Sequence, residues 1–209
     1  MRLTRALLIA AAVAVLLLGF GTGLNWLGSG SEALPGIQGA AYADPRPLPE
    51  FELVGQDRER LDRSSLQGQW TLVYFGYTFC PDVCPITLQT LGAMQRRLDE
   101  QGAGDDVQVL FVSVDPQRDT PERLAQYAPY FGPRVRGASG SIDNLDRLTK
   151  ALGVVYARVG EKSDPDYLVD HSSAVLLINP EARLYAVMTA PHTVDTLLTD
   201  FLVLRAHHG

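Results

Sequence analysis

The sequence predicts an α/β domain, a mixed sheet flanked by helices, behind an N-terminal transmembrane helix. Three observations support this fold class. Runs typical of buried strands alternate with helical periodicities in the middle of the chain, two strand-like runs near the C-terminus favour a hairpin, and a long uncharged apolar run begins at residue 6. The 209 residues leave room for one such domain.

The N-terminal run, Ala6–Leu27, carries no charge, and about 20 apolar residues suffice to cross a bilayer as a helix. Two arginines precede it and the first charge after it is acidic, so the positive-inside rule leaves residues 1–5 in the cytoplasm and exports the remainder. A cleaved signal peptide is the alternative, because residues 41–44 offer an A-x-A pattern, but that pattern lies well beyond the apolar run. We therefore expect an uncleaved anchor over residues 6–27.

Residues 28–49 are rich in Gly, Ala, Ser and Pro and lack hydrophobic periodicity, which is typical of a flexible linker. The globular domain is then expected over residues 50–206. The formal net charge is -6 and the chain has no Lys/Arg-rich run, so nucleic acid is not an expected partner.

The first unit of the domain is a strand, a loop with the two cysteines of the chain, and a helix. Residues Trp70–Tyr77 are a continuous β-branched and aromatic run, typical of a strand buried on both faces. Cys80 and Cys84 follow this strand, and from Ile86 apolar residues recur at helical spacing until about Gly102. The cysteines are therefore expected where a strand ends and a helix begins, an edge at which the sites of α/β sheets gather.

The following segments repeat this alternation. A second buried strand is expected over Val107–Asp115, and a second helix begins with Pro121 in its first turn. A third helix is expected over Ser141–Gly153, with leucines on one face. Alternating strands and helices imply parallel strand pairing.

The end of the chain changes the pattern. Residues 173–180 and 183–188 are strand-like runs separated by a turn, which predicts a hairpin, and residues 193–206 form a closing helix. Residues 153–170 are an insertion with its own short hairpin around residues 163–166. This order of elements is the layout of a thioredoxin-like domain.

The cysteine pair allows three interpretations: a structural disulfide, a redox-active dithiol, or a metal site. A disulfide across so short a loop would remove little unfolded-state entropy, which disfavours the first. Dithiol oxidoreductases typically use C-x-x-C, whereas Cys80 and Cys84 are four apart and share one face of a helical turn, where the helix N-terminus favours thiolates. Two converging soft thiolates suit Cu(I) or Zn, but the spacing alone leaves metal binding and redox exchange open.

A metal site would need a third ligand, and three of the four histidines are poor candidates. His207 and His208 are expected in a frayed, solvated C-terminal tail. His192 precedes Thr193, a helix cap, and is expected in a surface loop.

His171 is the better candidate. It immediately precedes the first strand of the C-terminal hairpin, a position where thioredoxin-like proteins usually have a cis-proline that faces the cysteine motif, so we expect its side chain to point at Cys80 and Cys84. By itself, a loop histidine bonded to Asp170 or to a backbone carbonyl is the simpler interpretation.

Acidic and basic residues after the second strand have structural interpretations. Asp119 with Glu122 fits a capping box for the second helix, with Thr120 as a competing cap. Asp115 and Arg118 are expected near the cysteine loop, where their role is open.

Three motifs of the chain, Gly76–Pro85, Val112–Pro121 and Asp170–Pro180, resemble in order and spacing those of the Sco/SenC copper proteins. These are membrane-tethered, thioredoxin-like factors of cytochrome c oxidase assembly. The resemblance covers essentially all of residues 50–206. It implies that the copper ligands are Cys80, Cys84 and His171.

The resemblance implies binding of both Cu(I) and Cu(II), which fits the ligands because thiolates favour Cu(I) and an added imidazole tolerates Cu(II). It further implies that the protein is a metallochaperone, not an enzyme, that takes part in building the dinuclear copper centre of oxidase subunit II. A copper donor and a thiol reductant are further expected partners. Together with the anchor, these expectations place the domain in the periplasm, tethered to a bacterial inner membrane.

Two other functions would use the same cysteines. A thiol-disulfide reductase that keeps the oxidase copper-site cysteines reduced would not need His171. A peroxidase of the peroxiredoxin or glutathione-peroxidase type is disfavoured, because Thr78 lies two residues before Cys80 and does not reproduce the peroxiredoxin spacing.

Overall fold

The computed structural model describes residues 31–32, 36–160 and 166–208. Within these ranges no helix is both long and apolar enough to cross a membrane. The anchor expected over residues 6–27 lies outside the described part of the chain.

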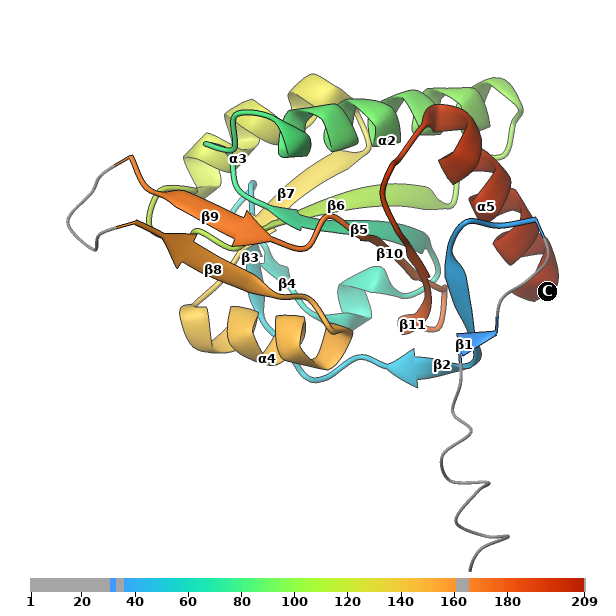
Figure 1. Cartoon of the computed structure of the whole chain (residues 1–209), viewed down its shortest axis with the longest axis horizontal. Helices are drawn as coiled ribbons and strands as arrows, with labels where there is room; N and C mark the ends of the chain where they lie inside the picture. Colours follow the sequence, from blue (N-terminus) through green and yellow to red (C-terminus); the bar gives the residue numbers. More distant parts are fainter. Residues whose placement is uncertain (1–30, 33–35, 161–165, 209) are drawn as a thin grey trace, which may run out of the picture.

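A mixed sheet forms the centre of the domain (Figure 1), with nine strands in the described residues and the order β1-β2-β11-β10-β5-β6-β7-β3-β4. Strands β5, β6 and β7 pair in parallel and the other pairs are antiparallel. The strands are β1 (Ser31–Glu32), β2 (Ala40–Pro47), β3 (Leu53–Gly55), β4 (Arg60–Leu61), β5 (Trp70–Gly76), β6 (Val107–Ser113), β7 (Val135–Ser139), β10 (Val175–Ile178) and β11 (Arg183–Met188).

Helices cover both faces of this sheet, with α2 and α3 on the opposite side from α4 (Figure 1). The helices are α2 (Val83–Glu100), α3 (Pro121–Tyr127), α4 (Ile142–Leu152) and α5 (Val194–His208), with 3-10 turns at Arg63–Leu66 and Ala128–Phe131. The apolar residues that predicted α2 form its buried face, namely Leu88, Leu91, Met94 and Leu98. The mixed sheet flanked by helices is confirmed.

The central strands follow the sequence closely. All seven residues of β5 are buried, as the unbroken apolar run predicts for a strand covered on both faces. The expected hairpin of β10 and β11 is present, and β10 pairs antiparallel with β5. The C-terminal end of β5 therefore lies in the middle of the sheet, and the cysteine loop starts there.

Strand β2 differs from the expectation. Residues 40–47, placed in the flexible linker by their composition, pair with β11 in the main sheet. This strand contains two prolines and only one buried residue, so its sequence lacks the alternation typical of a strand. Its pairing with β11 is interrupted between Leu184 and Ala186. Asp200 of α5 also fixes the preceding turn, because its buried carboxylate accepts hydrogen bonds from the backbone N–H groups of Gln38 and Gly39.

The expected insertion forms a separate two-stranded antiparallel sheet of β8 (Tyr156–Val159) and β9 (Leu168–His171). Most of its residues are exposed, and it extends from one end of the domain (Figure 1). The turn expected around residues 163–166 lies largely outside the described part of the chain. We call β8 and β9 together the His171 hairpin.

Candidate metal centre

The cysteine loop, residues 77–82, connects β5 to α2 and directs both sulfur atoms to one side. Cys84 lies in the first turn of α2, where the backbone N–H groups have no partner within the helix. The N–H of Cys84 points at the sulfur of Cys80, with an N–Sγ distance of 3.5 Å. Cys80 precedes the helix, so the two cysteines do not share a helical turn as the sequence predicts, but their sulfurs still lie within 4.8 Å of each other.

Cys84 is fully buried, and the end of β5 makes room for it. A Cβ on Gly76 would lie 2.6 Å from the Cys84 sulfur and 3.0 Å from the Phe111 ring, so only glycine fits at this position without displacing a neighbour. Burial raises the pKa of the Cys84 thiol. The expected gain in thiolate from the helix N-terminus is therefore outweighed at Cys84 by loss of solvent, and the metal-free residue is a thiol at neutral pH.

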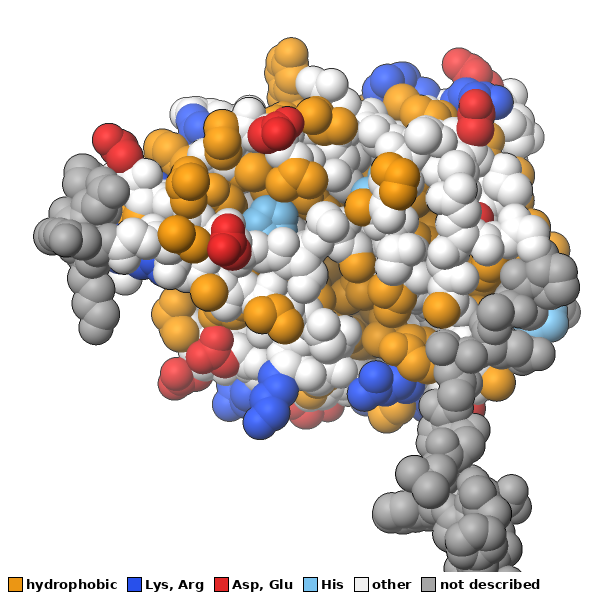
Figure 2. Space-filling model, in the orientation of Figure 1, with side chains coloured by type: hydrophobic (Ala, Val, Ile, Leu, Met, Phe, Trp, Pro, Cys, Tyr) orange, Lys and Arg blue, Asp and Glu red, His pale blue; other side chains and the backbone are white. Residues whose placement is uncertain are grey.

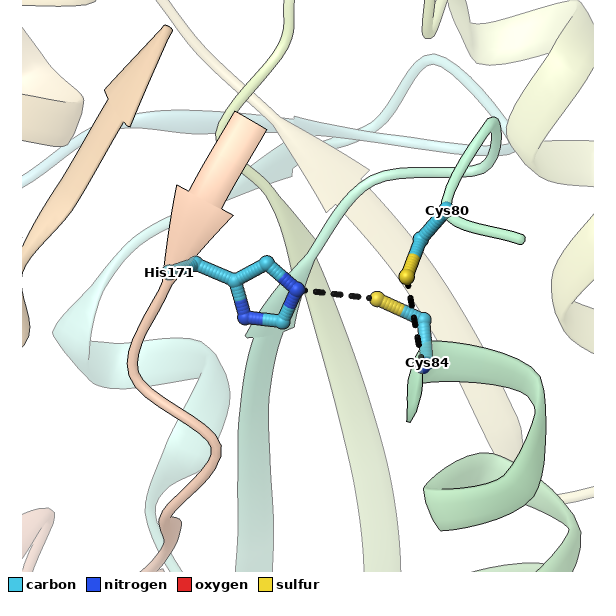
Figure 3. Close-up of side chains that lie close together, drawn as sticks. All are labelled: Cys80, Cys84 and His171. Carbon is cyan, nitrogen blue, oxygen red and sulfur yellow. Dashed lines mark hydrogen bonds between the residues drawn. The ribbon is translucent and has the colours of Figure 1, made fainter. Parts of the chain in front are cut away.

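His171 is the last residue of β9 and points at the cysteines (Figure 3), with its Nε2 atom 3.2 Å from the Cys84 sulfur. Its Nδ1 atom lies 3.1 Å from the carbonyl oxygen of Ser172. A hydrogen on Nδ1 satisfies that carbonyl and leaves the Nε2 lone pair directed at the sulfur, which is how second partners orient metal-binding imidazoles. The rings of Tyr74 and Tyr77 hold the imidazole edge-on, each with its centroid 6.0 Å away.

Burial lowers the pKa of His171. The imidazole therefore stays neutral, and able to bind a metal, at a lower pH than an exposed histidine would. The ligand atoms of Cys80, Cys84 and His171 all lie within 4.8 Å of one another. Two sulfurs and one nitrogen suit a soft or borderline ion such as copper or zinc. The three residues named from the sequence are thus brought together from a loop, a helix and a hairpin (Figure 3).

Asp119 has a different role from the one its sequence suggests. Thr120, not Asp119, caps α3, because its hydroxyl accepts a hydrogen bond from the backbone of Arg123. The Asp119 carboxylate is instead 1% exposed and accepts bonds from the Thr78 backbone N–H at 2.8 Å and the Thr78 hydroxyl at 2.7 Å. A third donor is the hydroxyl of Ser113 at the end of β6. The expected Asp119 capping box is therefore wrong, and Asp119 ties the cysteine loop to the core.

The Thr78 hydroxyl takes part in this network, since it donates to Asp119 and accepts from the side-chain Nε of Arg123 at 3.0 Å. Asp115 and Arg118 lie beside the cysteine loop, as expected, and form an ion pair there. No periodicity in the sequence indicates the hydrogen bonds of Asp119 or the ion pair of Asp115 with Arg118. The sequence signal for both is the cluster of Asp and Arg residues that follows a buried strand.

The other histidines lie outside the metal-binding group, as predicted, but His208 is not in a solvated tail. Helix α5 continues through His208. The centroid of the His208 ring lies 5.0 Å from that of Trp70 and 5.2 Å from that of Tyr185. The Nε2 atom of His208 lies 3.1 Å from the Glu181 carboxylate. Aromatic contacts at the end of the helix explain why the last turn stays ordered. His192, half-buried, lies 2.8 Å from the carbonyl of Ser173, in the loop before α5.

A family model described as SCO1/SenC matches residues 40–203 of the chain. Over 153 residues the chain is 39% identical to "Protein SCO1 homolog 1, mitochondrial" of Arabidopsis thaliana. The matched region is 73% of this chain and 45% of that protein. The chain therefore spans less than half of the length of this relative.

Solved structures with the same fold include Arabidopsis thaliana ScoI with copper bound, which is 35% identical with a TM-score of 0.71, covering 77% of this chain and 98% of that chain. BsSco, described as a member of the Sco family of cytochrome c oxidase assembly proteins with a disulfide switch, is 23% identical. Its TM-score is 0.60, over 78% of this chain and 96% of that chain, a likeness that shows the fold alone.

Proposed function

Because the chain belongs to the SCO1/SenC family, we propose that it is a copper chaperone that delivers copper to the dinuclear copper site of cytochrome c oxidase subunit II, or helps to assemble that site. The observation that carries the proposal is the convergence of Cys80, Cys84 and His171 within 4.8 Å. The relative ScoI of Arabidopsis thaliana, which is solved with copper bound, supports copper binding. Copper is then the cargo of the protein.

Loading requires that the two thiols lose their protons, because the thiolate is the form that binds metal. At Cys84 the positive charge of the ion compensates for the burial that otherwise keeps the sulfur protonated. Two thiolates suffice for Cu(I), whereas Cu(II) is a harder ion and gains from the imidazole nitrogen of His171. The protein can therefore hold both copper states with one set of residues.

Delivery requires that a partner reach the ion. Cys80 is 9% exposed, and the apolar residues Phe79, Val83 and Ile86 near it in the sequence are 49%, 40% and 56% exposed. Figure 2 shows hydrophobic side chains around a histidine on this face of the molecule. Such an apolar rim suits contact with another protein, which would exclude water while the thiolates of the partner replace those of the chaperone.

The test uses the full-length chain in detergent, reduced and then offered Cu(II) or Cu(I). We expect bound copper and thiolate-to-Cu(II) charge-transfer absorption, both lost in Cys80→Ser. His171→Ala should still bind Cu(I), while its Cu(II) affinity falls by more than the roughly 10–100-fold that loss of an outer-shell partner costs. Wild-type Cu(II) affinity in His171→Ala would remove His171 from the site.

A second candidate function is a thiol-disulfide reductase that keeps the oxidase copper-site cysteines reduced. The observation in its favour is that Cys80 and Cys84 are both free thiols with sulfurs within 4.8 Å. A dithiol exchanger does not need His171. Full oxidase assembly in cells that carry only His171→Ala would favour the reductase, and failed assembly would favour the chaperone.

We also propose that residues 6–27 anchor the protein in a bacterial inner membrane with the domain in the periplasm, where it meets its copper donor and its thiol reductant. The uncharged apolar run and the arginines that precede it support this orientation. Protease added to spheroplasts should digest the domain. Protection of the domain until the membrane is lysed would reverse the orientation.

A further inference from the structure

The candidate ligand His171 lies on a hairpin outside the main sheet, so something must hold that hairpin at the cysteine loop. Two of the four residues of its β9 strand are exposed, and Val169 is its buried residue. Behind the hairpin is a hollow of about 120 Å³, lined in part by Ile142 of α4, by Tyr156 and by Tyr167. Tyr167 and Val169 reach the hydrophobic core, but the hollow leaves packing on that side incomplete, so polar and ring contacts add to what fixes the hairpin.

Arg118 contacts both segments that carry candidate ligands. Its guanidinium carbon lies 3.6 Å from the ring centroid of Tyr167, the residue before β9. The same carbon lies 4.8 Å from the ring centroid of Phe79, the residue before Cys80. It also lies 5.6 Å from the ring of Tyr77, whose edge packs on His171. Three aromatic rings around one cation make a favourable cation–π cluster across the junction.

Asp115 fixes the orientation of this cluster. One carboxylate oxygen accepts the Arg118 Nε–H at 2.5 Å, and the other accepts the Tyr167 hydroxyl at 2.6 Å. Both charged partners are largely buried, with 15% and 3% of their side chains exposed, so the ion pair is shielded from solvent. Asp115 lies two residues after the end of β6, and the cluster thereby connects the hairpin to a core strand.

We propose that Arg118 is a positioning residue that holds the His171 hairpin against the cysteine loop, and that it thereby sets how strongly the site favours Cu(II) relative to Cu(I). The inference rests on the proposed function in that copper is taken as the cargo. Arg118 acts through its contacts with Tyr167, Tyr77 and Phe79. If the hairpin loosens, the two thiolates remain in place, so Cu(I) loses little while Cu(II) loses its nitrogen donor.

The chain supplies a matched control in Arg158. Its guanidinium carbon lies 3.5 Å from the same Tyr167 ring, but Arg158 belongs to β8, within the hairpin itself. Arg118→Gln and Arg158→Gln therefore remove the same kind of contact from the same ring. Arg118→Gln also removes the contacts with Tyr77 and Phe79 of the cysteine loop.

The experiment measures Cu(I) and Cu(II) affinity of the reduced full-length chain by competition with chelators. We expect Arg118→Gln to lower Cu(II) affinity by about 10–100-fold and Cu(I) affinity by less than about threefold. Arg158→Gln should change both by less than about threefold. An equal loss of both copper states in Arg118→Gln, or equal effects of the two variants, would overturn the proposal.

A metal-free readout separates this inference from the function itself. In the reduced apo protein, nuclear Overhauser contacts between the His171 ring and the Tyr74 and Tyr77 rings should weaken in Arg118→Gln and persist in Arg158→Gln. Persistence of these contacts in Arg118→Gln overturns the positioning role even if the protein binds no copper. Absence of copper binding in the wild type would overturn the proposed function alone.

Two gentler variants cover the case in which Arg118→Gln does not fold. Tyr167→Phe keeps the stacked ring and removes only the hydroxyl that donates to Asp115. Arg118→Lys keeps the charge but loses the planar stacking and the directed Nε–H. Both should show the same selective loss of Cu(II) affinity with a smaller magnitude, and a loss shared equally by Cu(I) in both would overturn the proposal.

Discussion

The two halves of the candidate copper site are held in different ways. The cysteine loop lies between the fully buried strand β5 and helix α2, and a buried carboxylate, Asp119, fixes it to the core. His171 ends a hairpin whose strands are mostly exposed and which pairs with no strand of the main sheet. The thiol half is built on a core strand and helix, whereas the histidine half is a separate small sheet that reaches the core through Tyr167 and Val169.

This difference matches the demands of the two copper states. Under the proposed function, the two cysteines in the core half would suffice for Cu(I) once deprotonated, whereas Cu(II) would also need the imidazole on the hairpin. Damage to the cysteine loop should therefore affect both copper states, and damage to the hairpin mainly one.

The largest effect is expected from Asp119→Ala. The change leaves three buried donors without an acceptor, namely the Thr78 N–H, the Thr78 hydroxyl and the Ser113 hydroxyl. We expect the free energy of unfolding to fall by about 3 kcal/mol. Affinity for both copper states should fall at least about tenfold, because the cysteine loop loses its connection to the core. Urea denaturation and chelator competition measure the two effects.

Asp200→Ala is the matched control for this variant. Asp200 is 3% exposed and also accepts hydrogen bonds from two backbone N–H groups, those of Gln38 and Gly39, but it lies on α5 outside the metal-binding group. It should lose similar stability and keep copper affinity within about twofold. If Asp119→Ala also keeps wild-type copper affinity, the cysteine loop is not positioned by Asp119.

The second effect is expected from Gly76→Ala, which places a methyl group 2.6 Å from the Cys84 sulfur. Moving that sulfur or the strand should cost about 2 kcal/mol of unfolding free energy and weaken both copper states. Gly137→Ala on β7 is the comparison, because its methyl group would press on Leu124 and Ala128 instead, at 3.1 Å and 3.2 Å. Copper titration of both variants distinguishes strain at the site from general overpacking, and equal copper losses would contradict the role given to Gly76.

How much the sequence predicts also differs between the two regions. Strand β5 and helix α2 carry long, unbroken patterns, so the position of Cys80 and Cys84 follows from periodicity and spacing alone. His171 was assigned by its place before the hairpin strand and by resemblance, since no local pattern marks a ligand on an exposed strand. The convergence of the three atoms is a tertiary property that the sequence pattern does not contain.

The features that the sequence does not predict have a common physical cause, which is stabilisation by residues from distant parts of the chain. Strand β2 looks like a linker because β11, far along the sequence, supplies its hydrogen bonds. Asp119 looks like a helix cap because its true donors, Thr78 and Ser113, come from other elements. The last turn of α5 looks frayed because the Trp70 and Tyr185 rings that hold His208 are remote in sequence.

A third, smaller effect separates the two cysteines within the thiol half. Cys84 is fully buried and burial raises its pKa, whereas Cys80 retains 9% of its surface. Because alkylation needs an accessible thiolate, iodoacetamide should label Cys80 at least about tenfold faster than Cys84 in the reduced, metal-free protein. Mass spectrometry of peptides after timed quenching measures both rates. Faster labelling of Cys84 would contradict the burial that defines the core half of the site.

The smallest effect concerns the proton on His171. Burial lowers its folded-state pKa below the ordinary 6.5, so the unfolded chain binds this proton more readily than the folded protein. The contribution to stability is therefore complete above pH 6.5 and falls as the pH drops below it, with a slope of at most about 1.4 kcal/mol per pH unit for one proton. In the metal-free protein, His171→Gln should lose less unfolding free energy than the wild type between pH 7.5 and pH 5.5. The difference between the two curves isolates His171 from the other histidines. Parallel curves would mean that the imidazole is solvated, and that the hairpin is not closed on the cysteine loop when the metal is absent.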